Sequence, residues 1–241
     1  MQGKRRKSRV GPQQSTEKAV YGKDLNFASA EAYKLLRTNI LFALPDEKKC
    51  RVIGVTSASS GEGKSTTALN LSYMLAEAGE RVLLIEGDMR LPAISKRLGL
   101  SITPGLSNVL AGLNGVNEIL QESGIHKNLQ IISAGDIPPN PSELLGSKSM
   151  RILVELLSED YDFIVFDLPP VTEVSDALVA SKLADGMIVV VRQNYANRRA
   201  LMDTIQQLNY VEAKVLGFVM TRTSAGKGKK YYKRYSKYGT A

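Results

Sequence analysis

A glycine-rich segment at residues 58–65 has the composition of a phosphate-binding loop. Its sequence, Ala-Ser-Ser-Gly-Glu-Gly-Lys-Ser, follows an apolar run at 52–57 and opens a helical pattern. Backbone N–H groups in such a loop, with the positive end of the following helix, form a concave site for a polyphosphate. In this arrangement Lys64 reaches the β- and γ-phosphates and Ser65 ligates Mg²⁺. The residues predicted to bind a nucleotide here are Ser59, Ser60, Gly61, Glu62, Gly63, Lys64, Ser65 and Thr66.

Two acidic strand ends would place carboxylates beside these phosphates. The apolar run 163–167 ends in Asp167, and the run 82–85 leads into Glu86, Gly87 and Asp88. Strand ends of this kind meet at one edge of a parallel sheet, where carboxylates hold Mg²⁺ directly or through water. We predict metal contacts from Ser65, Asp88 and Asp167. Glu86 is either a proton acceptor for an attacking hydroxyl or a ligand of metal-bound water, and an ordinary turn is the alternative for each acid. The predicted catalytic set is Lys64, Glu86, Asp88 and Asp167.

Apolar strand-like segments alternate with helix-like segments along most of the chain. Strands that are apolar throughout and separated by helices indicate a parallel sheet that is covered on both faces. The expected fold is therefore a three-layer α/β/α P-loop NTPase with a mostly parallel sheet. The expected strands are 52–57, 82–85, 129–133, 163–167, 187–192 and 215–221, and the expected helices are 29–42, with Ser29 as N-cap, 64–78, 106–110, 116–120, 142–157, 175–183 and 197–208.

The net charge of +8 is concentrated at the two ends of the chain. Residues 1–9 carry five basic side chains and residues 226–241 carry six, with no acids in either segment, so residues 10–225 have a net charge of −3. We therefore divide the chain into a basic N-terminal arm at 1–24, a nucleotide-binding domain at 25–222 and a basic C-terminal segment at 223–241. A slightly acidic body argues against nucleic acid as the partner.

Cysteine usage and hydropathy limit the other classes. Cys50 is the only cysteine, which excludes an intramolecular disulfide and a cysteine-rich metal or iron–sulfur site. The longest apolar runs span four to five residues, far fewer than a membrane helix needs. A cytoplasmic protein is the expectation.

The C-terminal segment contains four of the ten tyrosines of the chain. No apolar periodicity accompanies them, so burial in a core does not explain their presence. A basic segment of this kind is attracted to a pocket that holds ATP and acids. The alternative is a solubilising end whose tyrosines are incidental. The predicted phosphate acceptors are Tyr231, Tyr232, Tyr235 and Tyr238.

Taken together, the motifs resemble those of the bacterial tyrosine kinases of capsule and exopolysaccharide synthesis, in the firmicute-type form with a separate cytoplasmic kinase chain. The resemblance runs from about residue 29 to the end, and it depends on the order and spacing of several motifs. These are Ser-Gly-Glu-Gly-Lys-Ser at 60–65, Asp-Met-Arg-Leu-Pro at 88–92, Gly-Asp-Ile-Pro-Pro-Asn-Pro-Ser-Glu-Leu-Leu at 135–145, Asp-Leu-Pro-Pro at 167–170, Ala-Asp-Gly at 184–186 and the terminal tyrosines.

The resemblance implies an ATP- and Mg²⁺-dependent protein-tyrosine kinase that autophosphorylates its C-terminal tyrosines between neighbouring subunits of a ring-shaped homo-oligomer. It also implies regulation of capsular or exopolysaccharide synthesis and export. The implied partners are a membrane adaptor of the polysaccharide co-polymerase type, which activates the kinase and holds it at the inner face of the membrane, and a cognate tyrosine phosphatase.

The chain departs from the family pattern at four places. Glu86 replaces an Asp, Ala58 replaces the first Gly of the loop, and Thr221 replaces an Asn that helps to hold adenine. We expect Thr221 and the adjacent Arg222 to contact the nucleotide. The oligomer helix normally has the pattern Glu-x-x-Arg-x-x-Arg, and here Lys replaces the first Arg, which removes a bidentate fork and weakens the contact. The expected oligomer contacts are Glu31, Lys34 and Arg37.

Two other functions are compatible with the same fold. A regulatory ATPase switch of the partitioning and cell-division type would carry an extra lysine in the loop, where this chain has Ser59, and would lack the tyrosine-rich end. A catalytically weakened adaptor of a polysaccharide export complex is favoured only by Glu86.

Overall fold

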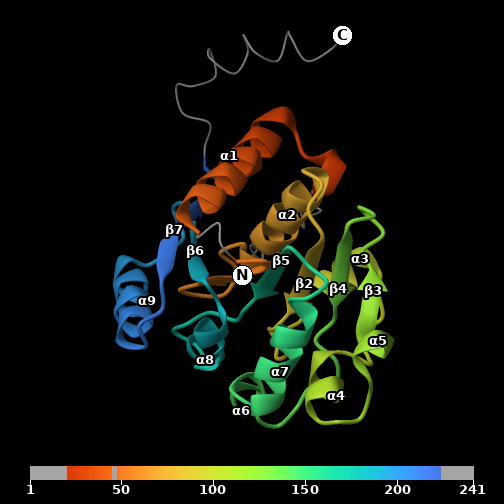
Figure 1. Cartoon of the computed structure of the whole chain (residues 1–241). Coiled ribbons are helices and arrows are strands. Elements are labelled where there is room, and N and C mark those ends of the chain that lie inside the picture. The colour runs from red at the N-terminus through yellow and green to blue at the C-terminus, as the bar shows by residue number, and fades with distance from the viewer. Residues whose placement is uncertain (1–20, 45–47, 224–241) are drawn as a thin grey trace, which may run out of the picture.

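A seven-stranded sheet forms the centre of the molecule (Figure 1). The computed structural model describes residues 21–44 and 48–223. The strands lie in the order β3-β4-β2-β5-β1-β6-β7, and every neighbouring pair is parallel except β3 and β4. Their bounds are β1 Arg51–Ser57, β2 Val82–Glu86, β3 Leu120–Glu122, β4 Leu129–Ile132, β5 Phe163–Asp167, β6 Gly186–Arg192 and β7 Val215–Thr221.

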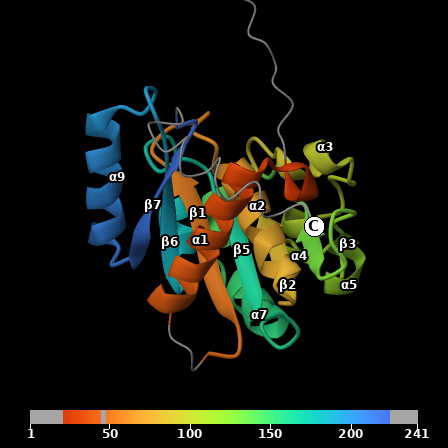
Figure 2. The same ribbon diagram turned by 90° about the horizontal axis from the view of Figure 1, so that it is seen from above.

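Helices cover both faces of this sheet, as the views in Figures 1 and 2 show. Helices α1, α2 and α3 pack on one face, and α4 to α9 pack on the other. Their bounds are α1 Phe27–Ala43, α2 Lys64–Glu77, α3 Ile94–Leu98, α4 Leu106–Leu110, α5 Val116–Ile119, α6 Pro141–Leu145, α7 Lys148–Leu157, α8 Asp176–Ala180 and α9 Arg198–Tyr210, with short 3₁₀ turns at η1 Gly22–Asp24 and η2 Ser181–Leu183. The predicted three-layer α/β/α fold is confirmed.

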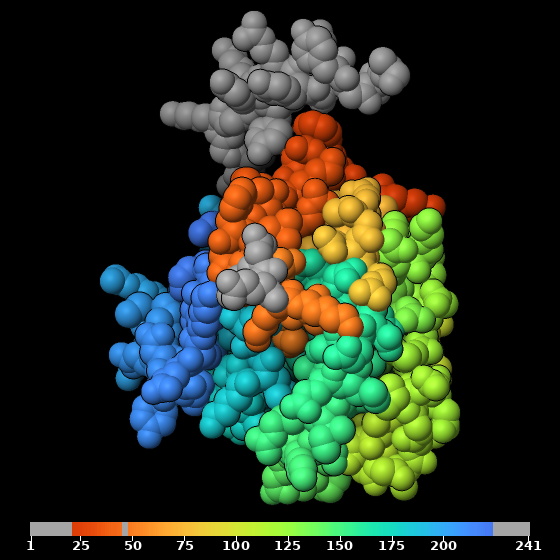
Figure 3. Space-filling model, in the orientation of Figure 1, coloured from red at the N-terminus to blue at the C-terminus, as the bar shows by residue number. Residues whose placement is uncertain are grey.

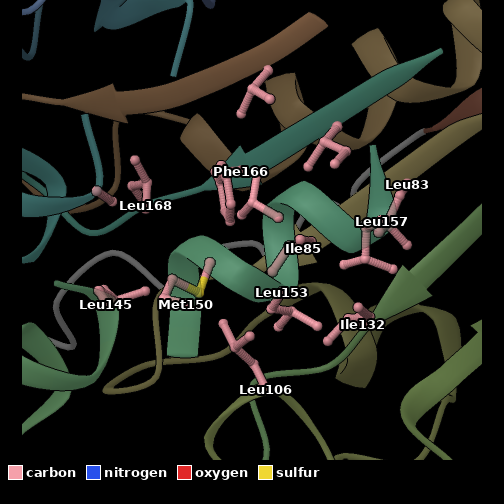
Figure 4. Close-up of a cluster of buried hydrophobic side chains, with 14 of the residues drawn as sticks. Leu83, Ile85, Leu106, Ile132, Leu145, Met150, Leu153, Leu157, Phe166 and Leu168 are labelled. Atoms are coloured by element: carbon pink, nitrogen blue, oxygen red, sulfur yellow. The ribbon is translucent and has the colours of Figure 1, made fainter. Parts of the chain in front are cut away.

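Alternation along the strands divides the core into two apolar layers. In β2, Leu83 and Ile85 face α7, whereas Val82 and Leu84 face α2. Figure 4 shows Leu153 and Leu157 of α7 directed toward the first of these layers. Each fully buried aliphatic side chain stabilises the fold by about 1.5–3 kcal/mol. The two apolar layers together hold the strands in register, and the strand ends carry the acids.

Local sequence signals account for the places where the structure departs from the expected elements. The predicted helix 142–157 is wrong, because the chain breaks at Gly146 and Ser147 caps α7 by accepting a hydrogen bond from the Met150 N–H. Ser29 is not the cap of α1; the Asn26 side chain accepts from the Ser29 N–H and begins the helix at Phe27. Helix α3 and the antiparallel edge strand β3 were not predicted from the sequence.

The first described residues, 21–24, contact the folded domain. Residues 21–24 pack on the domain, because the Gly22 N–H donates to the Asn70 side chain at 3.0 Å and the Tyr21 hydroxyl donates to the Arg97 carbonyl at 3.0 Å. Residues 1–20 of the predicted arm lie outside the described residues, so the division of the chain at residue 24 stays a prediction. Most of the C-terminal segment, with its four tyrosines, lies outside the described residues. Within the residues that are described, no helix is long and apolar enough to cross a membrane.

Candidate nucleotide and magnesium site

The phosphate loop connects β1 to α2 at the carboxyl edge of the sheet. Gly61 and Gly63 adopt φ values of 76° and 101°, a left-handed conformation that favours glycine and turns the loop tightly. In the described part of the chain, no hydrogen bond uses the amide N–H groups of residues 61–65. A row of unpaired amides at a helix N-terminus is the arrangement that binds phosphate oxygens.

Lys64 and Asp88 form a largely buried ion pair at the centre of the site. The Lys64 Nζ lies 2.7 Å from the Asp88 Oδ2, and the two side chains are only 12% and 4% exposed. Burial alone would lower the pKa of Lys64, but the nearby Asp167 and Asp88 outweigh it and raise that pKa. The other Asp88 oxygen accepts from the Leu91 N–H at 3.1 Å. The structure thus brings the loop lysine and two of the predicted acids together.

The Asp167 carboxylate at the end of β5 is buried and has no hydrogen-bond partner on either oxygen within the described residues. Burial raises the pKa of Asp167 to about 6, with Lys64 and Ser65 opposing that shift and Asp88 and Glu86 adding to it. A buried polar group without a partner is costly, and it is usually retained for function. The two Asp167 oxygens are therefore available to ligate a metal ion.

These residues fit Mg²⁺ that is bound together with a nucleotide. Asp167 and Asp88 supply hard oxygen ligands and Ser65 supplies a hydroxyl, which match the preference of Mg²⁺. In residues 21–44 and 48–223 no group of three or more His, Cys, Asp or Glu could hold a metal ion. Phosphate oxygens and water would therefore complete the coordination, and the bound ion would neutralise charge on the phosphates.

Glu86 lies at the end of β2 and is fully buried. Its Oε1 accepts from the Ile94 N–H at 2.6 Å, and its Oε2 accepts from the Ser95 hydroxyl. Both oxygens are thus occupied by the first turn of α3. The longer side chain of Glu86 anchors that helix to the sheet, and its role as a base or water ligand stays a prediction.

Replacing Glu86 with glutamine is expected to lower the free energy of unfolding by about 1–3 kcal/mol, because both buried hydrogen bonds lose the carboxylate as acceptor and the Ser95 hydroxyl must turn to accept from the new amide. Urea denaturation measures this loss, and the exposed Glu155→Gln on α7 is the matched control. The phosphate-transfer rate at saturating ATP provides the second readout. A full rate in Glu86→Gln would reject the proton-acceptor role, and an unchanged stability would reject the anchoring role.

Arg90 connects the segment that follows Asp88 to helix α8 through an ion pair. Its guanidinium bonds both oxygens of the fully buried Asp176, at 3.0 and 3.2 Å. The Ser142 hydroxyl of α6 donates to the same carboxylate. Two of the family motifs, at 88–92 and 135–145, therefore meet at one buried aspartate. Asp176 was not predicted from the sequence, where its only signal is its place six residues after the Asp-Leu-Pro-Pro motif at 167–170.

The remaining predicted nucleotide contacts lie around the rim of the loop. The Thr221 hydroxyl at the end of β7 donates to the Glu62 carbonyl at 2.7 Å, so it braces the loop backbone, and Arg222 follows it with a φ of 51°. Arg97 donates to the Thr66 hydroxyl at 2.8 Å. The Glu62 carboxylate is buried without a partner among the described residues, and burial raises its pKa.

Two rim residues were missed from the sequence on the side of Ser60. The Glu173 carboxylate accepts from the Ser60 N–H at 2.7 Å, and the Tyr195 hydroxyl donates to the Ser60 carbonyl at 3.3 Å. Neither residue belongs to a recognisable motif. Both lie in loops more than a hundred positions from Ser60 in the sequence, so no local pattern predicts these contacts.

The predicted oligomer triplet lies on α1, and Figure 3 shows this helix at the surface of the molecule. Glu31 and Lys34 pair with each other at 3.0 Å, whereas Arg37 turns inward and donates to the Met74 carbonyl at 2.8 Å. The structure therefore brings two of the three together and directs the third to α2.

Known proteins share both the sequence and this arrangement. A family model described as an AAA domain matches residues 50–216. The tyrosine-protein kinase YwqD of Bacillus subtilis (strain 168) is 37% identical over 212 residues, which cover 88% of this chain and 87% of YwqD.

Solved structures agree with these sequence matches. The chimerical protein CapA2B2 superposes with a TM-score of 0.79 at 33% identity, covering 88% of this chain and 92% of that one. The kinase domain of the Escherichia coli tyrosine kinase ETK gives 0.78 at 28% identity, with 90% and 87% covered. The septum site-determining protein MinD from Pyrococcus horikoshii OT3, complexed with Mg-ADP, gives only 0.61 at 25% identity, with 73% and 72% covered. The chain therefore belongs to the bacterial tyrosine-protein kinases, a group of P-loop proteins with an AAA domain.

Proposed function

We propose that this tyrosine kinase transfers the γ-phosphate of Mg²⁺–ATP to tyrosines of its own C-terminal segment. The observation that carries the proposal is the buried Asp167 carboxylate, which has no hydrogen-bond partner among the described residues. This carboxylate interacts electrostatically with Lys64, and the backbone N–H groups of residues 61–65 in the adjacent loop are unpaired among the described residues. Mg²⁺ on Asp167, Asp88 and Ser65 would supply positive charge at the phosphates. Lys64 would exchange Asp88 for the phosphates when the nucleotide binds.

Position and charge support the C-terminal segment as the substrate. Strand β7 ends at Thr221, whose hydroxyl touches the phosphate loop, so the segment begins beside the nucleotide site. Residues 224–241 span at most about 60 Å when extended, enough to reach a neighbouring subunit. Six positive charges favour its approach to a site built from acids. The proposed acceptors are Tyr231, Tyr232, Tyr235 and Tyr238.

The surface of α1 supports contact between subunits. Leu35 and Phe42 are 61% and 87% exposed, and they lie two turns apart on the helix that carries Glu31 and Lys34. An exposed apolar patch that is rimmed by polar residues is typical of a protein–protein interface. We propose that α1 packs against a second copy of the chain, which presents its C-terminal segment in trans.

Phosphorylation would change the charge of the C-terminal segment. Each phosphate adds roughly −1.5 to −2 at neutral pH, so four phosphates would cancel or reverse the six positive charges. The segment would lose its attraction to the acidic site, and the oligomer would loosen. We propose that this cycle regulates capsular or exopolysaccharide synthesis and export. A membrane adaptor would hold the kinase at the inner face of the membrane, and a tyrosine phosphatase would reset it.

A mixing experiment tests transfer in trans. A chain with Asp167→Asn keeps its tyrosines but is expected to be inactive, and a chain truncated after residue 228 keeps its site but lacks the four acceptors. Each alone is expected to show little phosphotyrosine after incubation with ATP and Mg²⁺. The mixture is expected to phosphorylate the Asp167→Asn chain on the four tyrosines, as mapped by peptide mass spectrometry.

The matched control replaces the four tyrosines of the Asp167→Asn chain with phenylalanine, which should remove the signal from the mixture. Undiminished phosphate on that control, or phosphate mainly on tyrosines of the folded body such as Tyr73 or Tyr161, would reject the C-terminal segment as substrate. A signal in the wild-type chain that never appears in the mixture would reject transfer in trans.

A further inference from the structure

The carbonyl oxygens of the phosphate loop are held by side chains. Each carbonyl of residues 58–62 accepts a hydrogen bond from a side-chain donor. The donors are Thr172 for Ala58, Ser57 for Ser59, Tyr195 for Ser60, Arg192 for Gly61 and Thr221 for Glu62. A surface loop can leave such carbonyls to water, so side-chain donors on five successive carbonyls indicate that the orientation of these peptide groups matters.

Three of these donors come from one edge of the sheet, and we call them the loop brace. Arg192 ends β6, Tyr195 lies in the turn that follows, and Thr221 ends β7. The Arg192 guanidinium lies 4.6 Å from the centroid of the Tyr195 ring, and the Gln193 N–H donates to the Thr221 carbonyl at 3.1 Å. The three side chains of the brace therefore belong to one connected unit.

The loop brace packs directly against the phosphate loop. Its donors lie 3.3, 3.2 and 2.7 Å from the carbonyl oxygens of residues 60, 61 and 62, in that order. A Cβ atom on Gly61 would lie 3.3 Å from the Tyr195 hydroxyl oxygen, and one on Gly63 would lie 3.4 Å from the Thr221 methyl carbon. The brace is thus in contact with the two glycines that turn the loop.

Peptide geometry links these carbonyls to the amides that would bind phosphate. A trans peptide is planar, so its C=O and N–H groups point in opposite directions. Within the described residues the only cis peptide is Thr103–Pro104, so the peptides of the loop are trans. A donor that holds one carbonyl therefore turns the next N–H to the opposite side. The brace on residues 60–62 directs the N–H groups of residues 61–63 away from itself, and these amides have no partner in the described part of the chain.

We propose that Tyr195, Arg192 and Thr221 are positioning residues for the polyphosphate, which orient the amides of residues 61–63 before the nucleotide arrives. Donors that are already oriented lose less conformational freedom on binding, so the affinity for the phosphates is higher. The Thr221 hydroxyl donates its proton to the Glu62 carbonyl and acts on the loop backbone. This role rests on the nucleotide site proposed above and does not depend on which tyrosine accepts the phosphate.

The variants Tyr195→Phe and Thr221→Val test the brace, because each removes a hydroxyl and nearly keeps the shape of the side chain. A fluorescent, non-hydrolysable ATP analogue is displaced from the full chain, in the presence of Mg²⁺, by unlabelled analogue or by inorganic tripolyphosphate. Tripolyphosphate has no adenine or ribose. Each variant is expected to weaken both competitors by the same factor, about three- to tenfold, which corresponds to one hydrogen bond. The double variant is expected to weaken both by about 10- to 100-fold.

Two further variants are the controls. Thr221→Ser keeps the hydroxyl and is expected to keep both dissociation constants within about twofold of the wild type, a difference below the usual effect of one hydrogen bond. Tyr210→Phe removes the hydroxyl of a tyrosine on α9 that is 89% exposed, and it is expected to change neither constant.

Several results would overturn the role of the brace. Weaker binding of the ATP analogue with unchanged binding of tripolyphosphate would place Tyr195 or Thr221 against the adenine or ribose. Unchanged binding of both competitors would show that the amides are oriented without the brace. A loss in Thr221→Ser equal to that in Thr221→Val would show that the hydroxyl is not the cause. If the wild-type chain bound neither competitor, the nucleotide site itself would be rejected together with the brace.

Discussion

Replacing Lys64 with methionine is expected to abolish ATP binding and phosphate transfer and also to destabilise the nucleotide-free chain. The methionine cannot reach the phosphates with a charge, so affinity is lost. In the absence of nucleotide, the same change leaves Asp88 buried without its cation and Asp167 without a nearby positive charge. Removing one partner of a buried ion pair costs about 3–5 kcal/mol. Calorimetric titration with ATP and urea denaturation measure the two effects separately.

The double variant Lys64→Met with Asp88→Asn is the control for the second effect. It removes both charges of the pair, so we expect it to regain at least half of the lost stability and none of the affinity. If Lys64→Met bound ATP as tightly as the wild type, the assignment of residues 58–65 as the phosphate loop would be wrong. If its stability were unchanged, the ion pair with Asp88 would have no energetic importance.

Replacing Asp167 with asparagine is expected to abolish phosphate transfer while making the nucleotide-free chain more stable. Burial raises the pKa of this carboxyl from 3.8 to about 6, so the folded state holds the proton more tightly than the unfolded chain does. The ionised carboxylate then costs the fold about 3 kcal/mol above pH 6, and the cost disappears as the pH falls toward 4. Asparagine carries no charge and avoids this cost.

Urea denaturation at pH 8 and at pH 5 tests this expectation. The gain in the free energy of unfolding of Asp167→Asn should be largest at pH 8 and smaller at pH 5. For this variant, Mg²⁺ together with ATP should give no more stability than ATP alone. Asp203→Asn, at an exposed acid of α9, is the matched control and should change neither quantity. A variant less stable than the wild type at pH 8 would show that Asp167 is satisfied in the free chain.

The fold and the centre of the site could be predicted because their signals are local. Apolar runs that end in Asp167 and Glu86 gave the strands and their order along the chain. The run of glycines before Lys64 gave the loop, since a left-handed backbone at Gly61 and Gly63 requires that residue type. Parallel strand ends then had to converge at one edge of the sheet, which is where the acids lie.

The residues that sequence reasoning missed act through contacts between distant loops. Glu173 meets Ser60 across 113 positions, and Arg90 meets Asp176 across 86 positions. Nothing near either pair in the sequence fixes such a contact. The anchoring role of Glu86 was missed for a related reason, because α3 spans only Ile94–Leu98 and its N-cap residue, Ala93, has no side chain that could cap the helix. The break at Gly146 had a signal, a Gly-Ser pair that ends one helix and caps the next.

We expect one magnesium–nucleotide site, formed by Lys64, Asp88 and Asp167, to transfer phosphate to tyrosine. The most direct test of this transfer is the mass of the intact purified chain after incubation with ATP and Mg²⁺, followed by mapping of the modified residues. The wild-type chain is expected to gain up to four phosphates on tyrosine, and the Asp167→Asn chain is expected to gain none. Release of ADP and free phosphate without any phosphotyrosine would contradict phosphate transfer to tyrosine, because it would make the chain an ATPase switch.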